Sequence, residues 1–434
     1  MNIAAYPKYD EYSQRHWIGS SELPVHWAVK PLKHEAGIVL GKMLCPENKG
    51  GYSLRPYLKS KNVQWLSADV SSVDEMWFSP REMETYRLKL NDLVLSEGGE
   101  VGKTCIWRSE LDECYIQNSA HKVTMRPHND PRFHLYQFYA FGKYGGFDAA
   151  VNRVSIAHLT YEKLANIEFA FPPLPEQRAI AAFLDGKCAT IDEAVRIKEE
   201  QISLLRERRQ ILIQQAVTRG LNPDAPMKDS GIDWIGQIPA HWEVKRGKHL
   251  FREVNERSED GTEELLSVSH TTGVTARSEK NVNMFLAEDY TGSKLCQPGD
   301  VVINTMWAWM GALGVSDLTG IISPSYGVYR ALKDGSFNRR FLEWQLRTTP
   351  FIEQYNKIST GLHSSRLRLY PHMFLGLFMA LPDRAEQDAI VEHVERETGK
   401  IDKAISVKES QITALQEYKT SLINAAVTGK IKVL

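Results

Sequence analysis

The chain has 434 residues, too many for one hydrophobic core, and its 42% hydrophobic and 25% charged residues are typical of a globular protein. The formal net charge of −1 excludes a general basic field, so binding to nucleic acid would need positive charge gathered on one face. Five cysteines without a Cys-x-x-Cys pair argue against a disulfide framework or a cysteine zinc site, and the lack of a long apolar run argues against export and a membrane span. The expected location is the reducing cytoplasm.

The region from residue 20 to residue 170 has the pattern of short strands. Its β-branched and aromatic runs are interrupted by glycine, proline, asparagine and aspartate. Strands are expected at residues 93–95 and 122–125, and a helix is expected from Phe133 to Phe141. Together these elements predict a mixed, mostly antiparallel α+β domain.

One loop of this domain comes close to a phosphate-binding loop. In the segment from Ser96 to Thr104, three residues separate Gly98 from Gly102, whereas the G-x-x-x-x-G-K-[ST] loop needs four to wrap its N–H groups around phosphates. We therefore do not expect nucleotide binding here. Because no methyltransferase motif is complete and no histidine pair has zinc-site spacing, the sequence predicts a protein without catalytic activity of its own.

A long helix is expected next, because residues 191–218 contain neither proline nor glycine. Its hydrophobic and long side chains recur at alternating intervals of four and three residues, which is the spacing of a coiled-coil seam. The seam positions are Ile191, Val195, Lys198, Ile202, Leu205, Arg209, Leu212 and Ala216. Such a helix could pack on its own domain or on a second helix.

The second half of the chain repeats the first. The Glu-Gln pair that begins at Glu176 recurs at Glu386, and the offset of 210 residues continues through a second helix. The Trp-Ile-Gly and His-Trp elements of residues 17–27 recur in residues 234–242. The second seam consists of Ile401, Ile405, Lys408, Ile412, Leu415, Lys419, Leu422 and Ala426.

Both seams place a cation at the same two positions, and polar seam residues can fix the register and the partner of a helix. We therefore expect the two helices to pair with each other as an antiparallel coiled coil, related by a pseudo-two-fold axis, so that one chain imitates a dimer. Between them, residues 221–226 form a linker. A second α+β domain follows, with strands at 301–303 and 327–329 and a helix from Arg339 to Tyr355.

The repeated elements resemble a known family. The sequence Pro-Pro-Leu-Pro-Glu-Gln-Arg-Ala-Ile at residues 172–180, the helix after it, and Trp-Ile-Gly-Gln-Ile-Pro-Ala-His-Trp at residues 234–242 resemble the specificity subunits of type I restriction–modification systems. The resemblance covers nearly the whole chain. It implies two target-recognition domains, residues 1–170 and 222–380 (the latter including the linker), each followed by a helical spacer, residues 171–221 and 381–434. The second spacer lacks the double proline, so its connection to the domain is expected to be looser.

What the resemblance implies is a non-catalytic protein that binds double-stranded DNA at a bipartite, asymmetric target. Similar proteins recruit two modification subunits, which use S-adenosylmethionine to methylate adenine N6, and two restriction subunits, which are ATP-dependent and Mg-dependent motor–nucleases. No cofactor is expected on this chain itself. The alternative is a coiled-coil adaptor that binds only proteins through its two globular domains.

The candidate DNA contacts are polar or basic residues in loops that also hold small or aromatic side chains, because phosphates favour lysine and arginine while base edges favour arginine, asparagine, serine and threonine. In the first domain they are Gly99, Lys103, Thr104, Lys143, Tyr144, Asn152 and Arg153. In the second they are Thr305, Trp307, Trp309, Ser359, Thr360, His363, Ser364, Ser365, Arg366 and Arg368.

Overall fold

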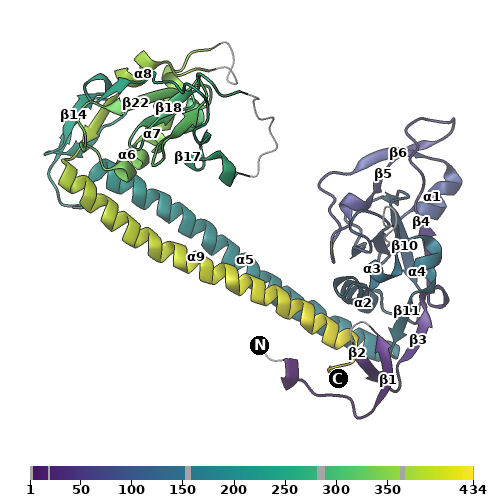
Figure 1. Cartoon of the computed structure of the whole chain (residues 1–434). Helices are drawn as coiled ribbons and strands as arrows, with labels where there is room; N and C mark the ends of the chain where they lie inside the picture. Colours follow the sequence, from purple (N-terminus) through teal and green to yellow (C-terminus); the bar gives the residue numbers. More distant parts are fainter. Residues whose placement is uncertain (1–2, 18–19, 152–157, 281–288, 362–366, 434) are drawn as a thin grey trace. The chain divides into compact units, whose positions relative to one another are not determined.

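The computed structural model describes residues 3–17, 20–151, 158–280, 289–361 and 367–433 (Figure 1). The chain forms two compact units. Unit 1 consists of Met1–Glu199 and Glu409–Leu434, and unit 2 of Glu200–Lys408. Each unit therefore contains one globular domain and one half of each of two long helices. The domain boundaries given above remain predictions.

The domain of unit 1 is built around a four-stranded antiparallel sheet with the order β4-β10-β7-β8. Two smaller strand pairs, β1-β2 and β3-β11, lie between this sheet and the long helices, and a three-stranded sheet β6-β5-β9 extends the other end (Figure 1). The strands are β1 Tyr12–Trp17, β2 Ser20–Pro24, β3 Ala28–Pro31, β4 Ala36–Leu40, β5 Ser53–Leu58, β6 Asp74–Phe78, β7 Leu93–Ser96, β8 Thr104–Ile106, β9 Tyr115–Ile116, β10 Ala120–Met125 and β11 Glu168–Phe171. The short helices are α1 Pro80–Tyr86, α2 Pro131–Lys143, α3 Gly146–Ala150 and α4 Tyr161–Asn166.

The domain of unit 2 repeats this plan. Its sheet has the order β15-β22-β19-β20, and the pairs β12-β13 and β14-β23 correspond to β1-β2 and β3-β11. The strands are β12 Met227–Asp229, β13 Gln237–Pro239, β14 Glu243–Arg246, β15 Phe251–Glu253, β16 Leu266–Ser269, β17 Gly273–Ala276, β18 Lys294–Cys296, β19 Val301–Ile303, β20 Leu313–Val315, β21 Gly320–Ile322, β22 Gly327–Ala331 and β23 Phe378–Leu381. The helices are α6 Arg339–Leu346, α7 Thr349–Ile358 and α8 Pro371–Gly376.

The helix predicted from Arg339 to Tyr355 is two helices. Helix α6 ends at Leu346 and α7 begins at Thr349, with Thr348 in an extended conformation as its N-cap. The cause is Pro350, whose ring would clash with the carbonyl of Leu346 in a continuous helix and which lacks the N–H that such a helix needs. Within α7 the proline lies in the first turn, where its missing N–H is not required.

The two long helices begin earlier than predicted. Helix α5 runs from Leu174 to Arg219 and helix α9 from Arg384 to Val427. Pro175 did not prevent the earlier start, because it lies in the first turn of α5. Gly186 and Gly399 lie inside the helices, where a glycine costs only about 1 kcal/mol relative to alanine.

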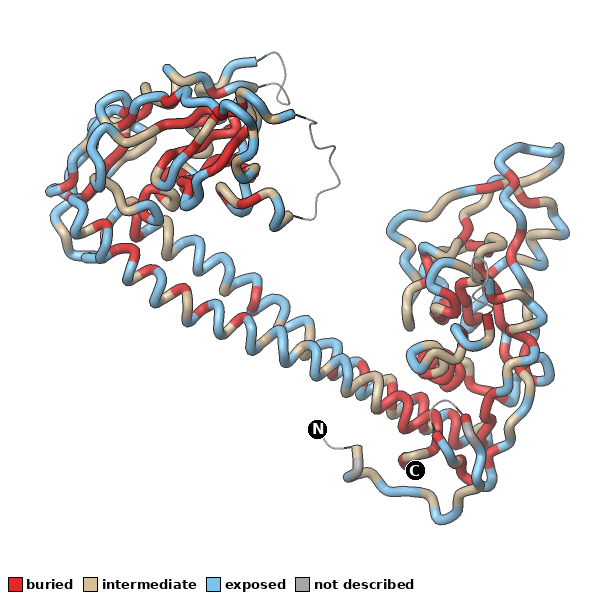
Figure 2. The backbone as a smooth tube through the Cα atoms, viewed as in Figure 1, coloured by how far each residue is buried: buried red, intermediate tan, exposed pale blue. Residues whose placement is uncertain are grey.

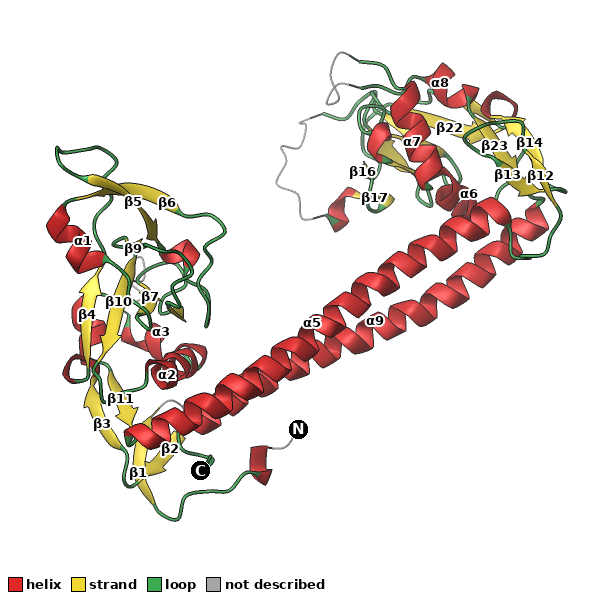
Figure 3. Ribbon diagram, turned by 180° about the vertical axis from the view of Figure 1, so that it is seen from behind, coloured by secondary structure: helices red, strands yellow, loops and turns green. Residues whose placement is uncertain are grey.

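The long helices pair through their seams in both units. In unit 1, Lys419 Nζ donates to Asp192 Oδ1 at 2.7 Å, and Lys198 Nζ donates to Gln411 Oε1 at 2.7 Å. Residue numbers on α9 fall as those on α5 rise, so the helices are antiparallel, and they lie side by side in Figures 1 and 3.

Unit 2 contains the symmetry-related contacts. Lys408 Nζ donates to Gln201 Oε1 at 2.6 Å, and Arg209 Nε lies 3.5 Å from Asp402 Oδ1. The repeat offset of 210 residues relates the two sets of contacts. The Lys419–Asp192 pair corresponds to Arg209–Asp402, and the Lys198–Gln411 pair corresponds to Lys408–Gln201. All four seam cations therefore contact a polar side chain of the facing helix, and the predicted fold class, with its antiparallel pair and pseudo-two-fold repeat, is confirmed.

The hydrophobic core of each domain includes the ends of both long helices. In unit 1, Leu184 of α5 and Leu422 of α9 belong to the same buried cluster as Trp27 of the domain. In unit 2, Val217 and Ile390 belong to the cluster of Trp242. Figure 2 shows buried residues concentrated at the helix ends and mostly exposed residues between them. Each domain is thus anchored on both helices.

Candidate nucleic-acid interface

The repeated sequence motifs contact each other in both units. Glu176, at the start of α5, accepts hydrogen bonds from Trp27 Nε1 at 3.0 Å and from His26 Nε2 at 2.8 Å. In unit 2, Glu386 near the start of α9 accepts the same bonds from Trp242 Nε1 at 3.2 Å and His241 Nε2 at 2.8 Å. The His-Trp element and the glutamate therefore form one joint that holds the domain on the helix.

The glutamine that follows each glutamate completes this joint. Gln177 donates to Pro172 O at 2.8 Å and accepts from the N–H of Asp130 at 2.8 Å, and Asp130 is the N-cap of α2. Gln387 donates to Pro382 O at 3.2 Å and accepts from the N–H of Asn338, the N-cap of α6, at 2.9 Å. Each glutamine thus fixes the start of a domain helix relative to the start of a long helix.

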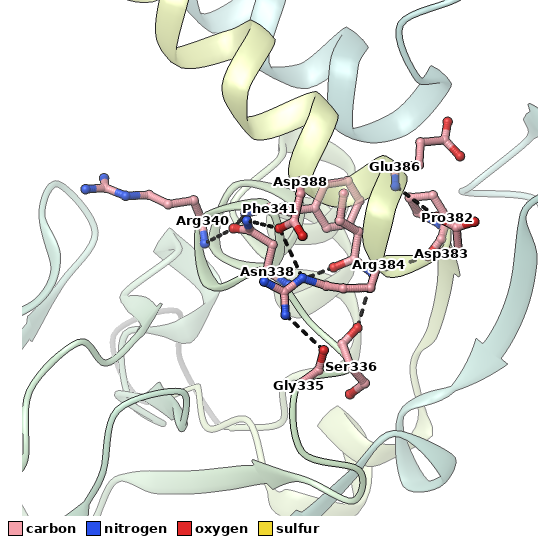
Figure 4. A network of polar contacts seen from close by, with 11 residues as sticks. Gly335, Ser336, Asn338, Arg340, Phe341, Pro382, Asp383, Arg384, Glu386 and Asp388 are labelled. Carbon is pink, nitrogen blue, oxygen red and sulfur yellow. Dashed lines mark hydrogen bonds and ion pairs between the residues drawn. The ribbon is translucent and has the colours of Figure 1, made fainter.

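The joint of unit 2, which lacks the double proline, has a network of polar contacts of its own (Figure 4). Arg384 donates to Gly335 O at 2.9 Å and to Asp388 Oδ1 at 3.0 Å, and Asn338 Nδ2 donates to the same carboxylate at 2.6 Å. An arginine and an aspartate of the helix thus bind the domain where the proline is missing, and the looser connection stays a prediction.

Unit 1 strengthens its joint with a buried carboxylate instead. Glu35 is nearly buried, which by itself would raise its pKa, but hydrogen bonds from Lys30, Asn129 and His128 outweigh the burial and hold the pKa at about 2. In unit 2, Lys245 corresponds to Lys30, and the position that corresponds to Glu35 is occupied by Leu250. The Glu-Gln and His-Trp joints of the two units are therefore alike, but the side chains that support each joint differ.

The loop that approached a phosphate-binding motif is the turn between two antiparallel strands. Ser96 N donates to Lys103 O at 2.8 Å, and Gly99 and Gly102 adopt positive φ angles of 74° and 78° that suit glycine. Strand β8 follows this turn, whereas a phosphate-binding loop leads into a helix whose N–H groups face the phosphates.

Two of the predicted lysines of unit 1 meet at one tryptophan and one glutamate. The Lys143 ammonium lies 4.9 Å from the centroid of the Trp65 ring, and Trp65 Nε1 donates to Glu100 at 2.9 Å. Lys103 Nζ lies 2.8 Å from the same glutamate. Trp65 was not predicted, because it comes from a distant loop and no local pattern marks it.

The remaining predicted residues of unit 1 differ in exposure. Gly99 and Tyr144 are exposed, so both are open to a ligand. Thr104 is fully buried and its hydroxyl donates to Gly102 O at 2.9 Å, so its side chain does not reach the surface. Asn152 and Arg153 lie outside the described residues.

In unit 2 the structure brings the two predicted segments together. Leu369 N donates to Thr305 O at 3.0 Å, which places the end of the second segment against the tryptophan loop. Thr360 and Arg368 exchange two backbone hydrogen bonds at 3.1 and 2.9 Å, so they close the base of the loop that begins at Ser359. His363, Ser364, Ser365 and Arg366 lie outside the described residues.

The tryptophans of this surface stack on each other. Their ring centroids are 6.0 Å apart with an interplanar angle of 26°, and Trp307 is 46% exposed while Trp309 is half-buried. Ser325 also belongs to this surface, because its carbonyl accepts from Thr305 Oγ1 at 2.9 Å. The surface of unit 2 thus combines an aromatic face, hydroxyl groups and the exposed Arg368.

The described residues contain neither a metal-binding cluster nor a membrane helix. No three of their histidine, cysteine, aspartate or glutamate side chains gather as a metal ion would need. None of the described helices combines the length and the apolar character that a membrane crossing requires. All five cysteines are buried and unpaired.

Comparison with known proteins finds one family domain and two relatives in sequence. Residues 42–203 match the type I restriction modification DNA specificity domain. This match supports the resemblance of the chain to type I specificity subunits. The chain is 23% identical to the type I restriction enzyme MjaVIII specificity subunit of Methanocaldococcus jannaschii, over 99% of this chain and 98% of that one. It is 21% identical to the putative MjaX specificity subunit of the same organism, over 95% of each chain.

Solved structures share the fold of this chain. A chain from a study of complex assembly and conformational transition of the type I R-M system aligns with a TM-score of 0.67 and 16% identity, over 94% of this chain and 99% of that one. The HsdS subunit from Thermoanaerobacter tengcongensis aligns with a TM-score of 0.51 and 16% identity, over 95% and 99%. The MjaVIII relative and the Thermoanaerobacter tengcongensis protein are both specificity subunits by name.

Proposed function

We propose that this chain is a specificity subunit that binds double-stranded DNA at a bipartite, asymmetric target and that each domain recognises one half of it. The observation that supports this proposal is the combination of one repeated frame with two different surfaces. The Glu-Gln and His-Trp joint is the same in both units, whereas the polar loops that each domain presents are not. Similar domains with unlike surfaces suit an asymmetric target better than a palindrome.

In unit 1 the candidate surface is formed by Gly99, Lys103, Lys143 and Tyr144, with Trp65 and Glu100 holding the lysines. Lysine is a phosphate ligand, and the stacked cation on Trp65 leaves Lys143 exposed. We assign this surface mainly to the backbone of one half-site. Thr104 is left out because it is buried.

In unit 2 the surface formed by Thr305, Trp307, Trp309, Thr360 and Arg368 carries different chemistry. Ser359 is left out because its hydroxyl is buried. Arginine binds the O6 and N7 atoms of guanine with two hydrogen bonds, and an exposed tryptophan presents a flat face to a base or a thymine methyl group. We assign base contacts of the second half-site to this surface.

The chemistry of modification and restriction belongs, in this proposal, to partner subunits. Two modification subunits would transfer methyl groups from S-adenosylmethionine to adenine N6, and two restriction subunits would use ATP and Mg²⁺ to translocate and cut DNA. The proposal for the chain itself is recognition only. A cytoplasmic location follows from these partners.

Selection from a random duplex pool tests this function. The full chain, assembled with its modification subunits, should enrich two unlike short motifs separated by a gap of fixed length. Binding should weaken steeply as the salt concentration rises, because neutralised phosphates release counterions. A protein-only adaptor would enrich no motif and show no such dependence.

A further inference from the structure

Strands β16 and β17 of unit 2 form a two-stranded ribbon that ends in a polar turn. Their register pairs Ser269 with Gly273, which leaves three residues as the turn. These residues are all exposed, and we call them the ribbon tip: His270, Thr271 and Thr272. Ser269 Oγ accepts from the N–H of Thr272 at 3.1 Å and lies 3.1 and 2.8 Å from the two threonine hydroxyls. The ribbon tip therefore presents an imidazole and two hydroxyl groups on a defined backbone.

The ribbon is anchored on the main sheet of its domain. Leu266 and Val268 of β16 are buried in one cluster with Val302 of β19. A Cβ atom on Gly314 of β20 would lie 2.9 Å from Val274 N of β17, so the backbones of these two strands are in close contact. Strand β20 directly follows the tryptophan loop. The ribbon is therefore held beside the tryptophan surface.

Arg347, the C-cap of α6, holds the ribbon tip through its backbone. Its Nη2 donates to His270 O at 2.5 Å and to Thr271 O at 3.0 Å, and its Nη1 donates to Glu343 Oε1 at 3.0 Å. Gly273 has a positive φ of 66°, and a Cβ atom there would clash with the same carboxylate oxygen. Arg347 thus fixes the turn against α6 and leaves the side chains of the ribbon tip exposed.

Unit 1 supports its own candidate surface from the corresponding helix. The N-caps Asp130 and Asn338 align α2 with α6, and in this alignment Arg347 takes the place of Tyr139. Tyr139 packs edge to face on Trp65 with ring centroids 5.4 Å apart. Trp65 belongs to the candidate DNA surface of unit 1. The same helix position therefore supports a loop in each unit, and in unit 1 that loop lies at the surface already assigned to DNA.

Two cations flank the base of the ribbon. Arg277 directly follows β17, and Lys280 Nζ donates to Ser267 Oγ of β16 at 3.0 Å. Burial lowers the pKa of Lys280, and the nearby charge of Arg277 lowers it further. In the described part of the chain, neither cation has a carboxylate at ion-pair distance. Two neighbouring cations without an acidic partner favour an anionic ligand such as a phosphate.

We propose that the ribbon tip enters the major groove of the second half-site and reads base edges there, with Arg277 and Lys280 on the flanking phosphates and Arg347 as the positioning residue. The major groove of B-DNA admits a two-stranded β-ribbon, and threonine hydroxyls bind either donors or acceptors on base edges. The second half-site is then read by two elements of one domain, the tryptophan surface and the ribbon tip. This inference rests on the proposed function, which supplies DNA as the ligand.

Competition binding by the full chain, assembled with its modification subunits, tests the ribbon tip on duplexes with single base changes in the selected half-sites. The triple variant His270→Ala, Thr271→Ala, Thr272→Ala should lose roughly 5–150-fold discrimination within one half-site and none in the other. Its melting temperature should match the wild type, because all three side chains are exposed. A 7-deazapurine lacks the N7 acceptor of the major groove. Placed at each purine of that half-site in turn, it should weaken the wild type at a contacted base and cause the triple variant no further loss there.

Salt dependence separates the positioning residue from the phosphate ligands. Arg347→Lys and Arg347→Met should both lose discrimination in the same half-site, because lysine keeps the charge but cannot bridge two carbonyls and Glu343, and both should keep the wild-type salt dependence. The pair Arg277→Gln, Lys280→Gln should weaken binding to every sequence and reduce the slope of log affinity against log salt by about 2. The matched control Lys333→Gln removes one exposed cation beyond the other end of β22 and should leave the slope unchanged.

Wild-type discrimination in the triple variant, or equal losses at both half-sites, would overturn the inference while leaving the proposed function intact. A lower salt slope for Arg347→Met would make Arg347 a phosphate ligand and overturn its positioning role. Sensitivity of the ribbon tip to 3-deazaadenine, which lacks the minor-groove N3 acceptor, in place of 7-deazapurines would also overturn the inference. A wild-type complex that selects no pair of half-sites would reject the proposed function itself.

Discussion

Lengthening both long helices by seven residues should lengthen the preferred gap between the two half-sites by about three base pairs. The variant duplicates residues 194–200 in α5 and the matching residues 404–410 in α9, so each helix gains one heptad. Seven residues add about 10.5 Å to a helix, and base pairs are spaced about 3.4 Å apart along one strand. Duplexes that carry the two half-sites at different separations would measure the preferred gap.

This change preserves the seam on both sides of the insertion. Asp192 can still face Lys419, and Arg209 can still face Asp402, because both helices grow between these contacts by the same amount. Duplicating residues 194–200 in α5 alone forces one of the two contacts out of register, so this control should lose binding to the bipartite target at every gap. An unchanged preferred gap in the double duplication would mean that helix length does not set it.

Replacing Trp242 with alanine should lower the free energy of unfolding by about 3–5 kcal/mol, which is the usual cost of removing a large aromatic side chain from a core. Trp242 is fully buried in the core cluster of unit 2, and its indole N–H donates to Glu386. The substitution leaves a cavity and removes a partner of the glutamate that joins domain and helix. Urea unfolding of the full chain, followed by circular dichroism, would measure the loss.

The control is Trp307→Ala in the same domain. Trp307 is 46% exposed and contacts Trp309 by stacking, so its removal should cost no more than about 1 kcal/mol of stability. Equal losses for the two variants would contradict the assignment of Trp242 to the structural joint and of Trp307 to an open surface.

The helix pair could be predicted from the sequence because its determinants are local. The alternation of four and three residues and the repeated cations at Lys198, Arg209, Lys408 and Lys419 lie within two short segments. The structure adds the partner of each cation, which depends on the facing helix. The early start of α5 could not be predicted because proline and glycine usually interrupt a helix. Pro175 is tolerated because it lies in the first turn of α5, and Gly186 is tolerated because a single glycine costs little inside a long helix.

The joint between domain and helix was recognised as two motifs but not as a contact. Trp27 and Glu176 are far apart in sequence, so their hydrogen bond follows only from the fold. The same reason explains why Trp65 was missed beside Lys143. Thr104 was misjudged because a residue at the end of a turn looks exposed in sequence, whereas β8 buries it.

If each domain reads its own half of the target, a variant of one surface should affect only one half-site. The double variant Trp307→Ala, Arg368→Ala would be assembled with modification subunits and measured on duplexes in which one selected half-site or the other is scrambled. Discrimination should fall by about 1–3 kcal/mol at one half-site and stay unchanged at the other. Equal losses at both half-sites, or no loss at either, would contradict this assignment of one half-site to each domain.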